Sequence, residues 1–85
     1  MEDGFYFVYV LLSEKYRQHY ADYSSHLLSL RIEQHHKGSV SSTKNKRPLK
    51  LICFEACLNQ QDATKREKYF KTHYGERFYK NDTVN

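Results

Sequence analysis

Residues 5–12 read FYFVYVLL, and this stretch decides the fold class. Its two alternating faces are both apolar: one carries Phe5, Phe7, Tyr9 and Leu11, and the other carries Tyr6, Val8, Val10 and Leu12. Strands with two apolar faces are typical of sheets that are covered on both sides. The stretch therefore predicts a strand in a sheet with a packing layer on each face.

Two further stretches are expected to form strands. Residues 18–23 follow a polar turn at residues 13–17 and indicate a shorter, more polar strand that pairs with the first as a hairpin. Residues 49–58, LKLICFEACL, are again apolar on both faces. We therefore expect a three-stranded sheet, either mixed or antiparallel.

A first helix is expected between the second and third strands, over residues 26–36. Ser24 and Ser25 are candidate N-caps for it, and Gly38 is well placed to end it. Residues 37–50 are rich in serine and basic residues and contain no acid, which is typical of a loop.

A second helix is expected over residues 60–72, with Asn59 as its cap, followed by a short last helix over residues 74–80. The inner, core-facing stripe of the helix over residues 60–72 would carry Ala63, Glu67 and Phe70, and Tyr74 would continue it. The predicted order is β-β-α-β-α-α. This order indicates an α+β fold in which helices flank both faces of the sheet.

Charge is distributed unevenly along the chain. Residues 1–36 hold three basic residues against five acidic ones, a net charge of −2, whereas residues 37–85 hold eleven against five, a net charge of +6. A basic half is compatible with a polyanionic partner but does not by itself establish one. The bases available to a nucleic-acid backbone in the loop are Lys37, Lys44, Lys46, Arg47 and Lys50.

Cys53 and Cys57 lie four residues apart in the third predicted strand. Four strand steps span about 13 Å, whereas the Cα atoms of a disulfide lie about 4.4–6.8 Å apart. The two thiols are therefore not expected to bridge, and their spacing with His35 and His36 fits no zinc finger. Reduced thiols and the lack of a run of about 18 apolar residues favour a cytoplasmic protein without membrane association.

Several polar residues occupy positions that are unusual in a purely structural protein. Arg31 and His35 lie one helical turn apart near apolar positions, and Glu67 lies in an inner stripe. Tyr9 and Tyr20 lie in the first two strands. Taken singly, each of these residues more often has an ordinary structural role. A tyrosine in a strand is usually packed in the core, an arginine is solvated, a histidine near a helix end caps it, and a glutamate forms a surface ion pair. Together on one sheet face, they would suit phosphodiester chemistry.

The order of short motifs along the chain resembles that of the GIY-YIG nuclease superfamily. The matching stretches, spread over about residues 5–81, are FVYVLL, Tyr20, LRIEQH, GSVSSTKNKRPLKL, EA, REKYFK and YGERFYKN. The chain is similar to the small stand-alone bacterial branch, akin to the nuclease domain of the excision-repair endonuclease C subunit. The resemblance implies a single domain over residues 1–85 that acts as a divalent-metal-dependent DNA endonuclease.

The resemblance also implies roles for individual residues. Phe7-Val8-Tyr9 occupies the GIY position and Tyr20-Ala21-Asp22 the YIG position. Arg31 matches the arginine that faces the scissile phosphate, and Glu67 matches the glutamate that holds one Mg²⁺ or Mn²⁺. The implied catalytic residues are Tyr9, Tyr20, Arg31, His35 and Asn81, and the implied metal ligand is Glu67.

The second motif departs from the family pattern. Ala21 and Asp22 replace an apolar residue and a glycine, and the glycine normally lets the backbone approach the site closely. Asp22 would either add an acid near the metal or point to solvent. Three functions therefore remain open for the chain. It is an active nuclease, a nucleic-acid-binding module that has lost catalytic activity, or a protein-interaction domain. A protein partner could supply specificity to so small a domain.

Overall fold

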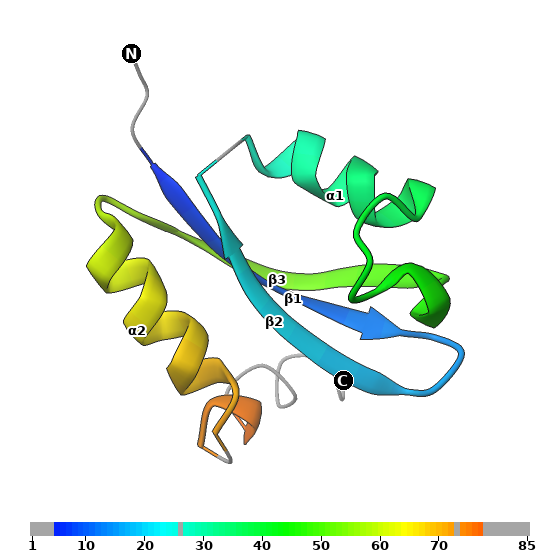
Figure 1. Ribbon diagram of the computed structural model, residues 1–85. Helices are drawn as coiled ribbons and strands as arrows, with labels where there is room; N and C mark the ends of the chain where they lie inside the picture. The colour runs from blue at the N-terminus through cyan, green and yellow to red at the C-terminus, as the bar shows by residue number, and fades with distance from the viewer. Residues whose placement is uncertain (1–4, 26, 73, 78–85) are drawn as a thin grey trace.

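The computed structural model describes residues 5–25, 27–72 and 74–77. Its elements are β1 (Tyr6–Ser13), β2 (Gln18–Ser24), α1 (Leu28–Lys37), the 3-10 turn η1 (Lys44–Lys46), β3 (Leu49–Cys57) and α2 (Gln60–Phe70). Residues 74–77 are again helical. Figure 1 shows α1 and α2 on opposite sides of the sheet. The predicted α+β class is confirmed, and the described elements follow the predicted order.

The sheet has the strand order β2-β1-β3, and both pairings are antiparallel. Across these pairings Tyr9 lies opposite Asp22 of β2 and opposite Phe54 of β3. The register between β1 and β3 shifts once in mid-strand. Such a shift allows Ile52 and Cys53, which are neighbours in sequence, to pack against the same core cluster.

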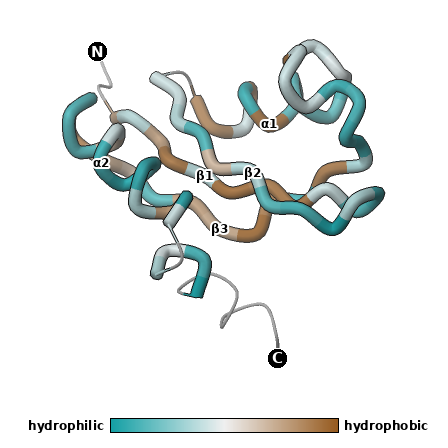
Figure 2. Tube along the Cα trace, turned by 60° about the horizontal axis from the view of Figure 1, so that its bottom comes forward, coloured by the Kyte–Doolittle hydropathy of each residue, from teal (hydrophilic) through white to brown (hydrophobic). Residues whose placement is uncertain are grey.

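Two separate hydrophobic clusters explain why β1 is apolar on both faces. The cluster beneath α2 consists of Val8, Val10, Ala63 and Phe70, and the cluster beneath α1 consists of Tyr9, Leu11 and Leu49 with Leu28, Ile32 and Leu51 packed against it. Figure 2 shows the hydrophobic residues concentrated along β1 and β3, whereas the edge strand β2 and the outer turns are largely hydrophilic. The two-sided packing predicted for residues 5–12 is confirmed.

Helix α1 starts slightly later than the sequence predicts. Leu27 takes the N-cap position without a capping side chain. Ser24 cannot take that position because it is the last residue of β2. Gly38 ends the helix as predicted: its φ of 82° lies in the left-handed region that glycine adopts readily.

Helix α2 is capped as predicted, since the side-chain oxygen of Asn59 accepts the backbone N–H of Asp62 at 2.8 Å. The prediction that Tyr74 continues the inner stripe is wrong, because 70% of this side chain is exposed. The helix ends at Phe70, so its periodicity does not reach Tyr74. At Gly75 a Cβ atom would collide with the backbone of Tyr69, so this turn requires glycine.

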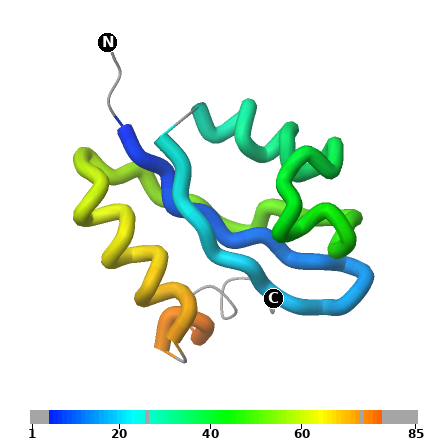
Figure 3. Tube along the Cα trace, viewed as in Figure 1, coloured from blue at the N-terminus to red at the C-terminus, as the bar shows by residue number. Residues whose placement is uncertain are grey.

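The segment between α1 and β3 folds back onto the β1–β2 hairpin, and the two run side by side in Figure 3. The Ser13 hydroxyl donates to the backbone carbonyl of Lys46 at 2.7 Å, and the Glu14 N–H donates to the carbonyl of Pro48 at 2.9 Å. These bonds fix where the segment lies relative to the sheet. The loop predicted over residues 37–50 is shorter in the structure and spans residues 38–48, because Lys37 ends α1 and Leu49 begins β3. Its residues Ser42 and Thr43 form one wall of the site described below.

As predicted, Cys53 and Cys57 are not joined in a disulfide. Among the residues that the structure describes, no helix has the length and apolar character needed to cross a membrane.

Candidate functional site

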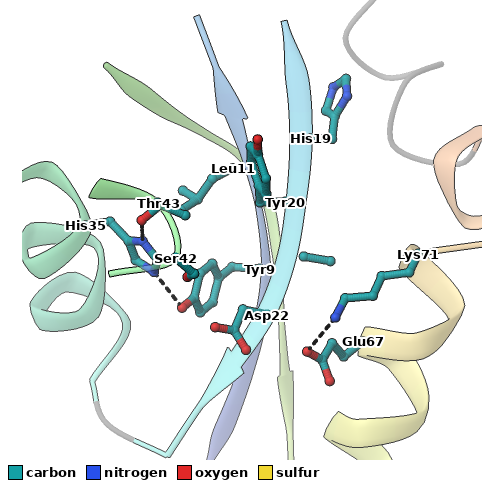
Figure 4. Close-up of a pocket in the computed structure, with 11 residues that line it drawn as sticks. Tyr9, Leu11, His19, Tyr20, Asp22, His35, Ser42, Thr43, Glu67 and Lys71 are labelled. Atoms are coloured by element: carbon teal, nitrogen blue, oxygen red, sulfur yellow. Dashed lines mark hydrogen bonds and ion pairs between the residues drawn. The ribbon is translucent and has the colours of Figure 1, made fainter. Parts of the chain in front are cut away.

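A cavity of about 410 Å³ lies along the edge strand β2. It is lined by Tyr9, Leu11, His19, Tyr20, Ala21, Asp22, His35, Ser42, Thr43, Glu67 and Lys71. Because β2 is at the sheet edge, side chains from the α1 side and from α2 reach the cavity around the same strand, as Figure 4 shows. The cavity thus brings together Tyr9, Tyr20, His35 and Glu67, whereas Arg31 does not line it. The expectation that these groups share one sheet face is wrong, because Tyr9 packs on the α1 side and Glu67 comes from α2 on the other side.

Tyr9 lies at the centre of the site and is fully buried. Its hydroxyl oxygen lies 2.9 Å from Nε2 of His35 and accepts a hydrogen bond from Nε of Arg31 at 3.1 Å. The Tyr9 and His35 rings meet edge to face, with 5.5 Å between their centroids. One phenol group therefore joins the arginine and the histidine that were predicted to act together.

Burial lowers the pKa of His35, and the nearby positive charge of Arg31 lowers it further, so the ring is neutral at pH 7. Its Nδ1 lies 2.7 Å from the Thr43 hydroxyl. The Tyr9 oxygen already accepts from Arg31, so its own proton is best directed at Nε2 of His35. We assign the proton of the ring to Nδ1, where it is donated to Thr43.

Burial also raises the pKa of Tyr9, against the opposing effect of the hydrogen bond from Arg31. The phenol is therefore protonated at neutral pH. It can take a proton from another group only if it passes its own proton on, and His35 Nε2 is the acceptor within reach. The arrangement is a route for one proton, from the cavity through Tyr9 to His35.

Arg31 directs all three guanidinium nitrogens at protein acceptors. Besides the bond to Tyr9, one nitrogen donates to Oε1 of Gln34 at 3.2 Å and the other lies 3.7 Å from a carboxylate oxygen of Asp22. The ion pair of Arg31 thus goes to Asp22 of β2 and not to an acidic residue of its own helix. The side chain of Arg31 remains 26% exposed and can reach solvent.

Glu67 projects from α2 into the cavity, and its side chain is only 15% exposed. Its Oε2 pairs with Nζ of Lys71, four residues on, at 3.2 Å, so an i,i+4 ion pair forms, but its glutamate faces the cavity and not the open surface. The described residues contain no group of three or more His, Cys, Asp or Glu that could hold a metal ion. A single carboxylate still suits Mg²⁺, which usually keeps several waters and takes its other ligands from phosphate oxygens.

The other predicted residues are placed less centrally. Tyr20 lines the cavity, and its hydroxyl donates to Oε1 of Gln18 at 2.7 Å. Asn81 lies outside the described residues. Of the five bases predicted to hold a nucleic-acid backbone, Lys44, Lys46 and Arg47 lie in the loop, Lys37 ends α1 and Lys50 lies in β3, and none of them lines the cavity. Lys37 pairs with Glu33 at 3.2 Å, and Arg47 donates to the carbonyl of Lys44 at 3.0 Å.

Two residues of the site carry contacts that sequence reasoning missed. Thr43 is buried and holds His35, but it lies in an irregular loop where no periodicity marks an inward position. Asp22 was noted as a departure, yet its pairing with Arg31 was not foreseen. The hairpin register, which puts Asp22 opposite Tyr9, could have indicated it.

The neutral, buried His35 should make folding sensitive to acid. In the unfolded chain the His35 ring takes up a proton near the usual pKa of 6.5. In the folded protein the pKa of the ring is lower, so protonation there requires a more acidic solution. The stability that this provides is complete above pH 6.5 and is lost as the pH falls from 6.5 towards the lowered folded-state pKa. Urea unfolding between about pH 7 and about pH 5 should show a shallower loss for His35→Gln than for wild type. His36→Gln, an exposed neighbour on α1, should keep the wild-type slope; equal slopes for all three proteins would contradict the assignment.

Comparison with known proteins identifies what the chain is similar to. Residues 5–81 match the family model described as the GIY-YIG catalytic domain. A UPF0213 protein from Pediococcus pentosaceus is 39% identical over 70 residues, which cover 81% of this chain and 70% of that protein. No solved structure matches the chain.

Proposed function

We propose, from the premise that this chain belongs to the GIY-YIG family, that it is a Mg²⁺- or Mn²⁺-dependent endonuclease that hydrolyses phosphodiester bonds in DNA. The family has a nuclease-type fold, and its nucleases generally use divalent metals. The observation that carries the proposal is the chain of contacts Arg31–Tyr9–His35 beside the Glu67 carboxylate. It combines a positive charge, a proton route and a potential metal ligand at one site.

The proton route gives Tyr9 and His35 their roles. Tyr9 takes a proton from the attacking water while it hands its own proton to Nε2 of His35. Thr43 orients the His35 ring by accepting from Nδ1. Concerted transfer suits a phenol with a raised pKa, because no free phenolate has to accumulate in the buried site.

Charge stabilisation falls to Arg31 and Glu67. The guanidinium of Arg31 faces the developing charge on the phosphate. Glu67 would hold the divalent metal, and the metal would supply positive charge at the phosphate. Tyr20, in the cavity wall, and Asn81 complete the proposed catalytic set.

The remaining parts of the proposal concern partners and location. The loop bases Lys37, Lys44, Lys46, Arg47 and Lys50 hold the DNA backbone without reading sequence. A protein partner that adds specificity belongs to the proposal, since the domain is small. A cytoplasmic location, supported by the thiols of Cys53 and Cys57, belongs to it as well.

A plasmid-nicking assay tests the activity directly. We expect the protein to convert supercoiled DNA to the nicked form with Mn²⁺ or Mg²⁺, and excess EDTA to abolish the reaction. The control is a mock preparation, purified in parallel from cells that do not express the protein, which reports any contaminating nuclease. Intact plasmid under salt conditions in which the protein demonstrably binds it, with either metal, would refute the proposed activity.

A nucleic-acid-binding module without catalysis is the second candidate function. The observation that favours it is the ion pair between Asp22 and Arg31, because it engages the arginine that the reaction needs. This candidate predicts salt-sensitive DNA binding with no cleavage in any metal. It also predicts that Glu67→Ala leaves the affinity for DNA unchanged, whereas the nuclease loses its metal-dependent reaction.

A further inference from the structure

Asp22 stands at the glycine position of the second family motif, and its side chain points into the site (Figure 4). One carboxylate oxygen accepts the backbone N–H of Tyr23 at 2.8 Å, and the other lies 3.7 Å from the Arg31 guanidinium. Both oxygens thus have partners within the protein. The carboxylate is 40% exposed, so an incoming ligand can also meet it.

Asp22 lies between two hollows. It lines the 410 Å³ cavity with Tyr9 and Glu67, and it also lines a neighbouring hollow of about 510 Å³ that includes Arg31. Arg31 lines only the 510 Å³ hollow, so a phosphate group that approaches its guanidinium from there comes close to the negative charge of Asp22. It must displace the Asp22 carboxylate or tolerate repulsion from it.

We propose that Asp22 sets the affinity of the site for phosphodiesters by competing with the phosphate for the Arg31 guanidinium. The inference rests on the proposed function, because it takes Arg31 as the phosphate-facing residue. A phosphate can take two parallel hydrogen bonds from a guanidinium, whereas the contact to Asp22 is a single one at 3.7 Å. A phosphate held firmly by other contacts therefore wins the competition, and one held loosely does not.

The competition makes the site selective for anchored DNA. A backbone already fixed at several loop bases presents its phosphate to Arg31 at a high local concentration. A short or weakly bound strand lacks that advantage. Asp22 thus links cleavage to prior binding on the basic loop, and the family glycine would impose no such condition.

The test is Asp22→Asn, which retains the size and the acceptor for the Tyr23 N–H but removes the charge. Affinity is measured with a fluorescein-labelled DNA duplex in EDTA, so that neither metal binding nor cleavage contributes. We expect Asp22→Asn to bind about fivefold more tightly than wild type. In an Arg31→Gln background the same change should alter the affinity by less than about twofold. Asp22→Gly, which restores the family residue, should show the same dependence on Arg31.

Glu14→Gln is the matched control, because it removes the same charge from the β1–β2 turn, away from Arg31. Two results would overturn the inference: an equal gain in DNA affinity from Asp22→Asn with and without Arg31, or an equal gain from Glu14→Gln. Either would mean that the lower negative charge of the whole protein, and not the pairing of Asp22 with Arg31, raises the affinity. Loss of Mn²⁺ binding in Asp22→Asn, measured by titration calorimetry, would overturn it in favour of a metal-ligand role. If wild type never nicks DNA but the Arg31-dependent gain appears, the proposed activity fails and this inference stands. If wild type nicks DNA without that gain, only this inference fails.

Discussion

Glu67→Gln is expected to lower metal-dependent nicking by at least about 100-fold. The substitution preserves the size of a side chain that is only 15% exposed, but it removes the charge that would hold the metal. The other carboxylate in the cavity, Asp22, already engages Arg31 and the backbone of Tyr23. Initial nicking rates over a range of Mn²⁺ concentrations measure the effect, and circular dichroism confirms that the fold persists.

The chain contains a matched control for this change. Glu33 and Lys37 on α1 form an i,i+4 pair at 3.2 Å, the same spacing and distance as Glu67 and Lys71 on α2. Glu33→Gln therefore makes the same chemical change in an ion pair outside the cavity, and it should nick at close to the wild-type rate. Wild-type nicking by Glu67→Gln would remove Glu67 from the metal site.

Phe70→Ala is expected to lower the free energy of unfolding by about 3–5 kcal/mol. Phe70 is fully buried and is the largest side chain of the cluster beneath α2. Its loss leaves a void against Val8 and Val10, the two residues of the central strand that face α2. A domain of this size has a total stability of only about 4–13 kcal/mol, so a large fraction of the protein should unfold at moderate temperature.

Tyr69→Ala provides the comparison, because it removes an aromatic ring from the adjacent position of the same helix. Tyr69 is 37% exposed and stacks with the guanidinium of Arg66 at 4.7 Å from the ring centroid. Its loss should cost about 1 kcal/mol or less. Urea unfolding of both variants measures the difference. Similar losses for the two would mean that α2 is not anchored through Phe70.

Much of the fold follows from local sequence patterns. The two apolar faces of residues 5–12 require two packing layers, and the stripe of Ala63 and Phe70 identifies the inner side of α2. Patterns were less informative where the chain changes direction. The start of α1 and the exposed position of Tyr74 depend on where neighbouring elements end, which periodicity does not record.

For the site, too, the sequence indicates which residues gather but not which contacts they make. The grouping of Tyr9, His35 and Glu67 was expected from motif order, and the cavity contains all three. The partners of these residues were not accessible from spacing. The pairing of Asp22 with Arg31 depends on the register of a hairpin, and the contact of Thr43 with His35 depends on how an irregular loop folds back. Neither separation, nine residues in the first case and eight in the second, is a period of a helix or strand that could have marked the contact.

The position of Thr43 has a consequence for how substrate contact and chemistry communicate. Thr43 directly precedes the turn η1, which carries the exposed Lys44 and the half-buried Lys46, and the Thr43 hydroxyl contacts Nδ1 of His35. A polyanion that draws these lysines towards itself moves the same short segment that sets the length of the histidine hydrogen bond. A displacement of this segment therefore changes the hydrogen bond at Nδ1 of His35 and, through it, the basicity of Nε2 on the same ring.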